Sequence, residues 1–336
     1  MRATEASAFF SAFENLPARQ RVKQMLAQNY ASAVLQHHPR GRQLLAVDVE
    51  ARCTALAETV ILEIQNLNGE ADRLFPLFSR LSRKHERPHA MWFAAFTEAY
   101  QEYRQNHKMQ GRYHRLHPWL QGTTCCDIGS GGGEWALFLQ RHHADFRQVD
   151  GLDVMDWRTP EARTHTGLQI LDLRQPGSMS KREYDTLCCL AVLHHVASNT
   201  STVATFLRNC HPALHSKGVL IIEEDVILPA GELAELPAVG RQAMQKAEEQ
   251  PFFGEFLKMD ATTQRAAIVL IDFLANCLAV GVPDMPFPCG FRTLKGWLQL
   301  FERCGFETLK IRVEGFVQGN FNQSSHVLFL LRKRNW

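Results

Sequence analysis

One stretch, from Thr123 to Gly133, constrains the fold of this chain more than any other. It reads Thr-Thr-Cys-Cys-Asp-Ile-Gly-Ser-Gly-Gly-Gly, so an apolar run ends in an acid and a group of glycines. Residues 123–127 predict a buried strand, the glycines predict a turn with few side chains, and residues 134–141 predict the helix that follows. Such a turn between a strand and a helix N-terminus lets a ligand lie against the backbone.

After this stretch the sequence alternates between strand and helix patterns, which predicts an α/β fold. The expected strands after the first are residues 148–154, 168–171, 186–192, 219–222, 307–313 and 325–331. We therefore expect a Rossmann-like, mostly parallel seven-stranded sheet with helices on both faces. Right-handed crossovers place the ligand crevice of such a sheet at the carboxyl ends of its strands.

The rest of the chain predicts helical additions to this sheet. Residues 1–115 have apolar residues at helical spacing, such as Leu56, Val60 and Ile64, and predict an N-terminal all-α cap or substrate domain. Residues 116–336 would form the second domain. Within it, residues 229–290 exceed the dozen or so residues that a crossover needs, so we expect a helical lid insertion with helices at residues 235–249 and 262–280.

Composition excludes several classes of protein. The 336 residues are 45% hydrophobic and 21% charged, an ordinary globular composition, and the net charge of +2 does not require a polyanionic partner. No apolar run reaches about 18 residues, and the N-terminus lacks a long apolar segment. We expect a cytoplasmic protein without a membrane partner; the oligomeric state stays open.

The nine cysteines predict reduced core thiols and no metal site. Two adjacent pairs, Cys125-Cys126 and Cys188-Cys189, fall in expected strands, where neighbouring side chains point to opposite faces. Buried thiols fit a reducing compartment. No CxxC pair or histidine spacing typical of zinc is present, so we expect no metal cofactor.

Acidic side chains stand at the predicted strand ends. Asp127 closes the first strand and Asp153 the second, where a carboxylate can accept both hydroxyls of a ribose. Asp150 and Asp156 are alternatives for this role, but the apolar neighbours of Asp153 favour it. Asp172, after the third strand, is a candidate for an adenine amino group.

The fourth and fifth strands end in titratable residues. Leu193-His194-His195-Val196 closes the fourth strand, and Glu223-Glu224-Asp225 closes the fifth. The two histidines are candidate general bases, because imidazole titrates near neutral pH. Glu224 is a candidate for holding the acceptor. A structural role for each histidine and a solvated loop at the acids are the alternatives.

Taken together, these motifs resemble the class I S-adenosylmethionine-dependent methyltransferases. The resemblance covers about 100 residues, from Cys125 to Asp225, and includes the glycine-rich motif, Gly151-Leu-Asp153, the fourth-strand end and Gly218-Val-Leu-Ile-Ile-Glu223. It implies S-adenosylmethionine as cofactor and S-adenosylhomocysteine as product. The donor-binding residues that it implies are Asp127, Gly129, Ser130, Gly131, Gly133, Asp153, Val154, Asp172, Leu173, Leu190 and Ala191.

Three functional hypotheses follow. The first is methyl transfer by direct displacement to an oxygen or nitrogen of a small molecule, enclosed by the helical additions. The second is an RNA or DNA methyltransferase, since residues 80–115 hold eight basic and three acidic residues. The third is a non-catalytic partner protein that binds S-adenosylmethionine. A nicotinamide or flavin dinucleotide is disfavoured, because Glu134 would repel a pyrophosphate at the helix N-terminus.

Overall fold

The computed structural model describes residues 108–177, 182–279, 289–316 and 325–334, together with residues 58–67 and positions 70, 73, 76, 77 and 80. These residues fall into two compact units. The sheet unit contains the described residues of Met109–Asp225, Leu294–Val313 and Val327–Trp336. The helical unit contains the described residues of Val226–Thr293 and Glu314–His326 and those before 109.

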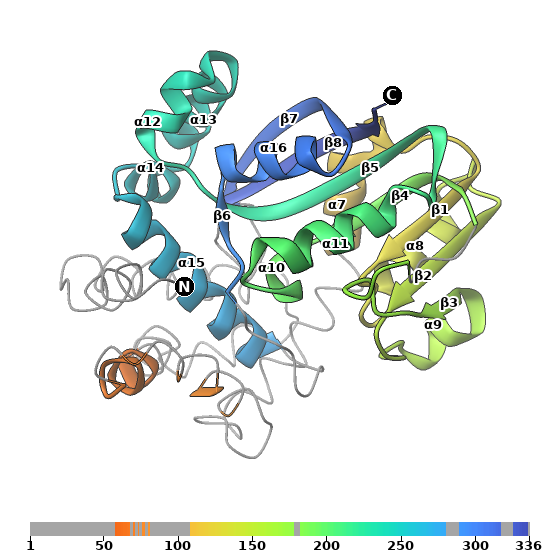
Figure 1. The fold of residues 1–336 in the computed structure, drawn as a ribbon, viewed down its shortest axis with the longest axis horizontal. Helices are drawn as coiled ribbons and strands as arrows, with labels where there is room; N and C mark the ends of the chain where they lie inside the picture. Colours follow the sequence, from red (N-terminus) through yellow and green to blue (C-terminus); the bar gives the residue numbers. More distant parts are fainter. Residues whose placement is uncertain are drawn as a thin grey trace, which may run out of the picture. The chain divides into compact units, whose positions relative to one another are not determined.

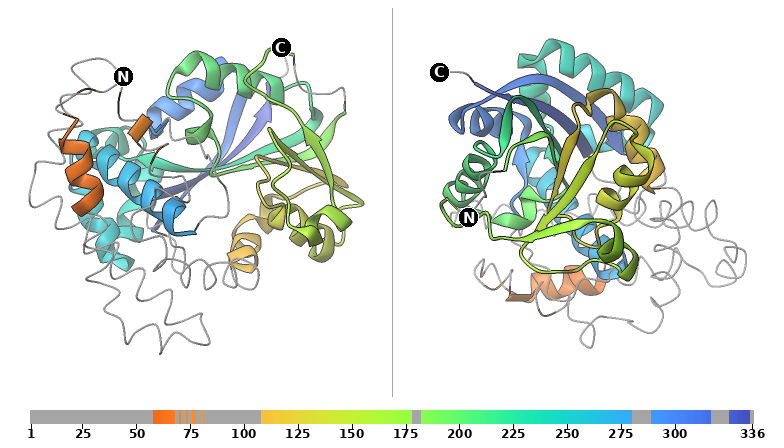
Figure 2. Two further views of the ribbon diagram at one scale, coloured as in Figure 1. Left: turned by 90° about the horizontal axis from the view of Figure 1, so that it is seen from below. Right: turned by 90° about the vertical axis from the view of Figure 1, so that its right-hand side faces the viewer.

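An eight-stranded sheet has the order β3-β2-β1-β4-β5-β8-β7, with the short β6 paired to β5 off this path. Every neighbouring pair from β3 to β5 is parallel, as Figures 1 and 2 show. The predicted α/β class and mostly parallel sheet are confirmed, with β6 as an additional strand. The strands are β1 (Thr124–Ile128), β2 (Gln148–Asp153), β3 (Gly167–Ile170), β4 (Tyr184–Leu190), β5 (Leu214–Ile227), β6 (Arg292–Thr293), β7 (Phe306–Phe316) and β8 (Ser325–Lys333).

The described helices fall into the same two units, and those of the sheet unit cover both faces of the sheet. Those of the sheet unit are α7 (Met109–Leu116), the 3₁₀ turn η3 (His117–Trp119), α8 (Glu134–His142), α9 (Pro160–His165), α10 (Leu193–Val196), α11 (Thr200–Cys210) and α16 (Leu294–Arg303). The helical unit includes α12 (Ala230–Glu235), α13 (Pro237–Glu249), α14 (Pro251–Leu257) and α15 (Ala261–Ala279).

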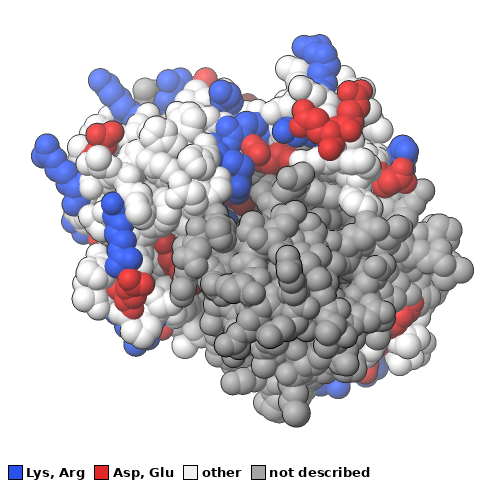
Figure 3. Space-filling view, turned by 180° about the vertical axis from the view of Figure 1, so that it is seen from behind, with Lys and Arg blue, Asp and Glu red and all other residues white. Residues whose placement is uncertain are grey.

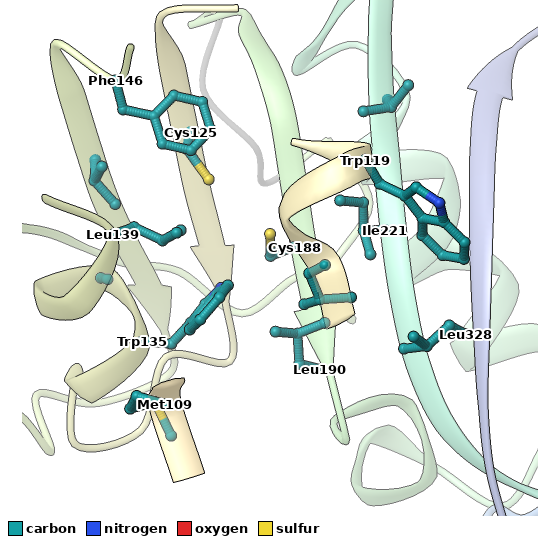
Figure 4. Packing of buried hydrophobic residues seen from close by; sticks show 14 residues of the cluster. Met109, Trp119, Cys125, Trp135, Leu139, Phe146, Cys188, Leu190, Ile221 and Leu328 are labelled. Carbon is teal, nitrogen blue, oxygen red and sulfur yellow. The ribbon is translucent and has the colours of Figure 1, made fainter. Parts of the chain in front are cut away.

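One face of the sheet packs against α7, η3 and α8 (Figure 4). Helix α8 begins directly after the glycine loop, with Glu134 in its first turn and Arg141 in its last, which suits the helix dipole. Burying each large apolar side chain here contributes roughly 1.5–3 kcal/mol. The cluster consists of Met109, Leu116, Trp119, Cys125, Trp135, Ala136, Leu139, Phe146, Val149, Cys188, Leu190, Val219, Ile221 and Leu328.

The opposite face packs against α11, which buries Val203, Leu207 and Cys210 at helical spacing. Helix α16 packs beside α11 (Figure 1). The Cys304 thiol, directly after α16, donates a hydrogen bond to the Ala204 carbonyl of α11. The adjacent cysteine pairs of β1 and β4 are free and buried, as predicted for core thiols. Burial raises the pKa of the Cys125 thiol well above its usual range, so this thiol stays protonated.

Two strand ends differ from the prediction. Strand β4 stops at Leu190, because Ala191 adopts a left-handed φ of 60° that no extended strand continues. His194 therefore lies in α10 and not at a strand end. Strand β5 runs to Ile227 and includes Glu223, Glu224 and Asp225, which were predicted to follow it. All three are buried, and Glu223 and Glu224 have charged or hydrogen-bonding partners far away in the sequence, Arg112 and His194.

Helices occupy the predicted insertion, residues 229–290. Helix α15 agrees with the expected helix at 262–280, whereas the helix expected at 235–249 is divided before Pro237. The buried Gln264 amide holds this unit together: its Nε2 donates to the carbonyls of Leu228, Phe256 and Met259, and its Oε1 accepts from the Leu228 N–H. No helix in the described ranges has the length and apolarity to cross a bilayer.

The predicted domain boundaries and the role of residues 229–290 as a lid stay predictions. Most of the predicted N-terminal domain, including residues 1–57 and 81–107, lies outside the described residues.

Candidate functional site

The glycine loop after β1 has a backbone that only glycine adopts easily. Gly129, Gly131 and Gly133 have φ values of 70°, 51° and 77°. A Cβ on Gly129 would lie 2.5 Å from a methyl carbon of Val192, so this glycine also permits close packing. A Cβ on Gly131 would meet nothing within 4 Å, so the loop is open to a ligand at this residue.

Backbone hydrogen bonds fix the loop against the end of β2. The N–H groups of Gly129 and Ser130 donate to the Leu152 carbonyl at 2.7 and 3.1 Å, and the Thr159 N–H donates to the Gly132 carbonyl at 3.0 Å. The Ser130 side chain is itself buried. The loop is therefore preorganised by strand β2 and by the segment before α9.

Asp153, the last residue of β2, contributes to this arrangement through its side chain. Its Oδ2 accepts the Gly131 N–H at 2.9 Å, and its Oδ1 accepts the N–H of Val154 at 2.7 Å. Each carboxylate oxygen has two lone pairs, so both retain capacity for a ribose hydroxyl. The side chain that was predicted to bind a ribose thus also orders the glycine loop.

The two alternative acids have other partners. Asp150 lies inside β2 and accepts hydrogen bonds from Tyr184 and Arg182. Asp156 forms an ion pair with Arg158, and this guanidinium lowers the pKa of the Asp156 carboxyl to about 2. Among the described residues, Asp153 is the one of these three acids whose side chain bonds to the loop.

Asp127 is a buried carboxyl at the end of β1. Burial raises its pKa from 3.8 to about 7, and the nearby carboxylates of Asp153 and Glu134 add to this rise. Arg112 and a hydrogen bond from the Ala136 backbone act in the opposite direction. Asp127 is therefore a group whose charge changes near neutral pH.

The ends of β2 and β3 present apolar side chains to solvent. Val154, Met155 and Ile170 are 46%, 54% and 61% exposed, and Asp153 is aligned with Ile170 in the parallel pair. Exposed apolar groups at neighbouring strand ends suit a flat aromatic ligand. Only Val154 was predicted. Met155 and Ile170 were missed, although their positions directly after and at a strand end are visible in the sequence.

Asp172 and Leu173 lie in the connection after β3. The Asp172 carboxylate forms a bidentate pair with Arg174 at 2.8 and 2.9 Å, which lowers the pKa of Asp172. Leu173 is buried. Because Arg174 already engages both Asp172 oxygens, a role for this carboxylate toward adenine stays a prediction.

The turn after β4 is organised by Glu224. The Ala191 N–H donates to the Glu223 carbonyl at 2.7 Å, and the N–H groups of Val192 and Leu193 donate to Glu224 Oε1 at 3.0 and 2.6 Å. One carboxylate thereby holds the two residues that follow the left-handed Ala191. Leu190, at the strand end, is buried below this turn.

His194 and Glu224 form a buried pair. His194 Nδ1 lies 2.7 Å from Glu224 Oε2, and both side chains are at most 2% exposed. A carboxylate only accepts hydrogen bonds, so Nδ1 carries the proton. The ring of the half-buried His195 lies 4.1 Å from that of His194. All three predicted catalytic residues thus meet in one place, where Glu224 is bonded to His194 and to the turn.

Glu223 points to two arginines that were not predicted for the site. Arg112 and Arg115, both on α7, place a guanidinium nitrogen 3.4 and 3.6 Å from the Glu223 carboxylate. The only sequence signal for them was the basic excess of residues 80–115. On the face in Figure 3, lysine and arginine side chains are interspersed with aspartate and glutamate over the described surface.

Comparison with known proteins gives one family match. A family model described as a methyltransferase domain matches residues 100–248. No curated protein matches the chain.

Several solved structures share the general fold. They include a candidate O-methyltransferase from Nostoc punctiforme (15% identity, covering 73% of this chain and 61% of that chain, TM-score 0.43) and the pyocyanin biosynthetic protein PhzM (14%, 78% and 62%, 0.45). A third is a SAM-dependent methyltransferase from Methanosarcina mazei (16%, 67% and 99%, 0.43). The chain thus spans less than two thirds of the first two proteins. At TM-scores below 0.5, these likenesses are too weak to assign a function.

The family match covers the glycine loop, Asp153 and the His194–Glu224 pair, and it coincides with the parallel strands β1 to β5. Residues 100–248 therefore match a methyltransferase domain, and the described strands of this region form a parallel, Rossmann-like sheet.

Proposed function

We propose that this chain transfers the methyl group of S-adenosylmethionine to an oxygen or nitrogen atom of a small-molecule acceptor. Three carboxylates at the glycine loop carry the proposal. Asp127 precedes the loop, Asp153 bonds to it, and the Glu134 carboxylate lies 2.6 Å from where a Cβ on Gly132 would stand. This negative charge suits a ligand with ammonium and sulfonium groups and opposes the pyrophosphate of a dinucleotide.

The strand order supports an orientation for the donor. With its amino acid part on the loop after β1 and its ribose on Asp153, the base extends over the ends of β2 and β3, toward Val154 and Ile170. The methyl group then faces the other neighbour of β1, strand β4, which is followed by Ala191 and by helix α10 with His194. This orientation places the acceptor on the side of the His194–Glu224 pair.

A bound sulfonium supplies a methyl group that is already activated for displacement. The acceptor's lone pair forms the new bond to the methyl carbon as the carbon–sulfur bond breaks, and the thioether S-adenosylhomocysteine leaves. A hydroxyl or protonated amine must also lose a proton, and we assign that proton to His194 Nε2, since Nδ1 is held by Glu224. We assign Glu224 to fixing the tautomer and orientation of the ring.

Calorimetric titration with S-adenosylmethionine tests the donor assignment. The wild type should bind it, NAD should not bind, and Asp153→Ala should lose most of the affinity. Glu161→Ala is the matched control, because this exposed acid of α9 forms a surface ion pair with Arg141, in the last turn of α8 and away from the glycine loop that precedes this helix. No binding of S-adenosylmethionine by the wild type would overturn the proposal.

Formation of S-adenosylhomocysteine with a mixture of phenols, hydroxy acids and amines tests the acceptor class. Turnover that requires His194 supports the proposal. Turnover with RNA or DNA alone would favour the nucleic-acid hypothesis, and tight donor binding without any turnover would favour a non-catalytic partner. We also expect a reducing, cytoplasmic location, which the buried free thiols support.

A further inference from the structure

Asn209 lies near the end of α11, is 7% exposed, and holds a loop from another part of the chain. Its Nδ2 donates to the carbonyls of Leu173 and Gln175 at 2.8 and 2.7 Å, and its Oδ1 accepts the Gly177 N–H at 3.0 Å. One amide group thus fixes three backbone groups of the segment Asp172–Gly177, which we name the base-side segment.

The base-side segment adjoins the strand end that carries Asp153. The Leu171 N–H donates to the Asp153 carbonyl at 2.9 Å, and the segment begins at the next residue. Its first turn is closed by Asp172, which accepts the Arg174 N–H at 2.9 Å. Asn209 holds the rest of the segment through its bonds to Leu173, Gln175 and Gly177. The segment is therefore anchored at Asp153 on one side and at α11 on the other.

The strand order determines what this segment can contact. A donor on the β1 loop with its ribose on Asp153 extends its base away from β4 and toward β3, because β2 separates β1 from β3. The base-side segment is the chain that directly follows β3. The base-side segment is thus placed to contact the edge of the base, whereas Val154, Met155 and Ile170 offer the base apolar contacts.

We propose that Asn209 is a positioning residue that sets the specificity of this site for adenine, through the base-side segment and without touching the donor. This inference rests on the proposed function. An asparagine amide supplies both the acceptor for Gly177 and the donors for Leu173 and Gln175, which neither an aliphatic nor an acidic side chain can do together. When Asn209 is replaced, the base-side segment loses the backbone geometry that distinguishes one base edge from another.

The experiment compares two ligands by calorimetry: S-adenosylhomocysteine and S-inosylhomocysteine, in which an oxo group replaces the adenine amino group. The wild type should bind the adenine ligand with a Kd about tenfold lower than that of the inosine ligand, the difference expected from one well-formed hydrogen bond. In Asn209→Leu, which is similar in size and cannot hydrogen-bond, affinity for the adenine ligand should fall until the preference is about twofold or less. A merely structural role would weaken both ligands equally.

A second variant perturbs the segment without altering α11. Gly177 has a φ of 70°, and a Cβ there would meet nothing within 4 Å, so Gly177→Ala strains the backbone without overpacking. It should lower the preference in the same way. The control is Asn199→Ala, which removes the N-cap of the same helix by losing the bond from the Thr202 N–H, and should leave the preference unchanged.

The outcomes separate the two proposals. If the wild type binds neither ligand, the proposed donor and this inference both fail. If the wild type prefers the adenine ligand and both Asn209→Leu and Gly177→Ala retain that preference, Asn209 has no role in specificity and the inference alone is overturned. The Gly177 variant gives this answer even if Asn209→Leu does not fold.

Discussion

The Oδ2 atom of Asp153 accepts a hydrogen bond from the backbone N–H of Gly131 at 2.9 Å. The acid at the end of β2 therefore orders the turn at the end of β1. In the proposed function the same carboxylate binds the ribose, so that loop geometry and ribose binding would be coupled through Asp153.

Changing Asp153 to asparagine separates these two tasks. The amide oxygen of Asp153→Asn can still accept from Gly131, but the side chain loses the charge and one acceptor position for a ribose diol. We expect a thermal midpoint close to that of the wild type and a loss of donor affinity of about tenfold or more. Asp153→Ala should lose more, because the loop is also released. Equal affinities of the two variants, by calorimetry, would contradict a role in ordering the loop.

Two loop glycines should respond differently to alanine. Gly129→Ala combines a left-handed φ with a contact 2.5 Å from Val192, and should destabilise the fold by about 2–4 kcal/mol. Gly131→Ala has a left-handed φ but open space around its Cβ, so it should cost only about 1 kcal/mol. Its new methyl group should nevertheless obstruct the donor. Urea denaturation and donor titration of both variants check this contrast, and a similar stability loss in both would contradict it.

Glu224→Gln tests the pair with His194. The Gln oxygen can replace Oε1 as acceptor for Val192 and Leu193, but its NH₂ group would face the Nδ1–H of His194. The histidine proton then moves to Nε2 and the base is lost, so kcat should fall by about 10²–10⁴-fold with little change in donor affinity. Glu224→Ala should in addition destabilise the fold by about 2–5 kcal/mol, because buried N–H groups lose their acceptor. Full activity of Glu224→Gln would exclude His194 as the base.

The buried Asp127 predicts a pH-dependent stability. Its folded pKa of about 7 lies above the ordinary 3.8, so between these values the folded state binds more protons than the unfolded state. This contribution to stability is fully present below about pH 4 and is lost as the pH rises through 7. Asp127→Asn cannot ionise, so its stability relative to the wild type should increase over the same window. Urea titrations at pH 4.5, 6 and 8 measure the difference; a difference independent of pH would show that Asp127 keeps its ordinary pKa.

Local patterns in the chain predicted the glycine loop, the strand that ends in Asp153 and the helix of α15. Each depends on neighbours within one element, where apolar periodicity and glycine placement act directly. The acids Glu223 to Asp225 were predicted to follow residue 222 at the end of the fifth strand, either holding the acceptor or beginning a solvated loop. In the structure they lie within β5, where Glu223 meets Arg112, 111 residues away, and Glu224 meets His194, 30 residues away.

The same contrast between patterns within one element and contacts between distant residues applies to the site as a whole. The amino-acid sequence by itself determined the α/β class, the position of the glycine loop and the position of Asp153 at the end of β2, because these follow from short-range spacing. Only the tertiary structure decided that Glu224 holds the turn of His194, that α7 supplies arginines to Glu223, and that Asn209 fixes the base-side segment. Those contacts join residues far apart in the chain, and hydrogen-bond geometry between them exists only once the sheet has brought its strand ends together.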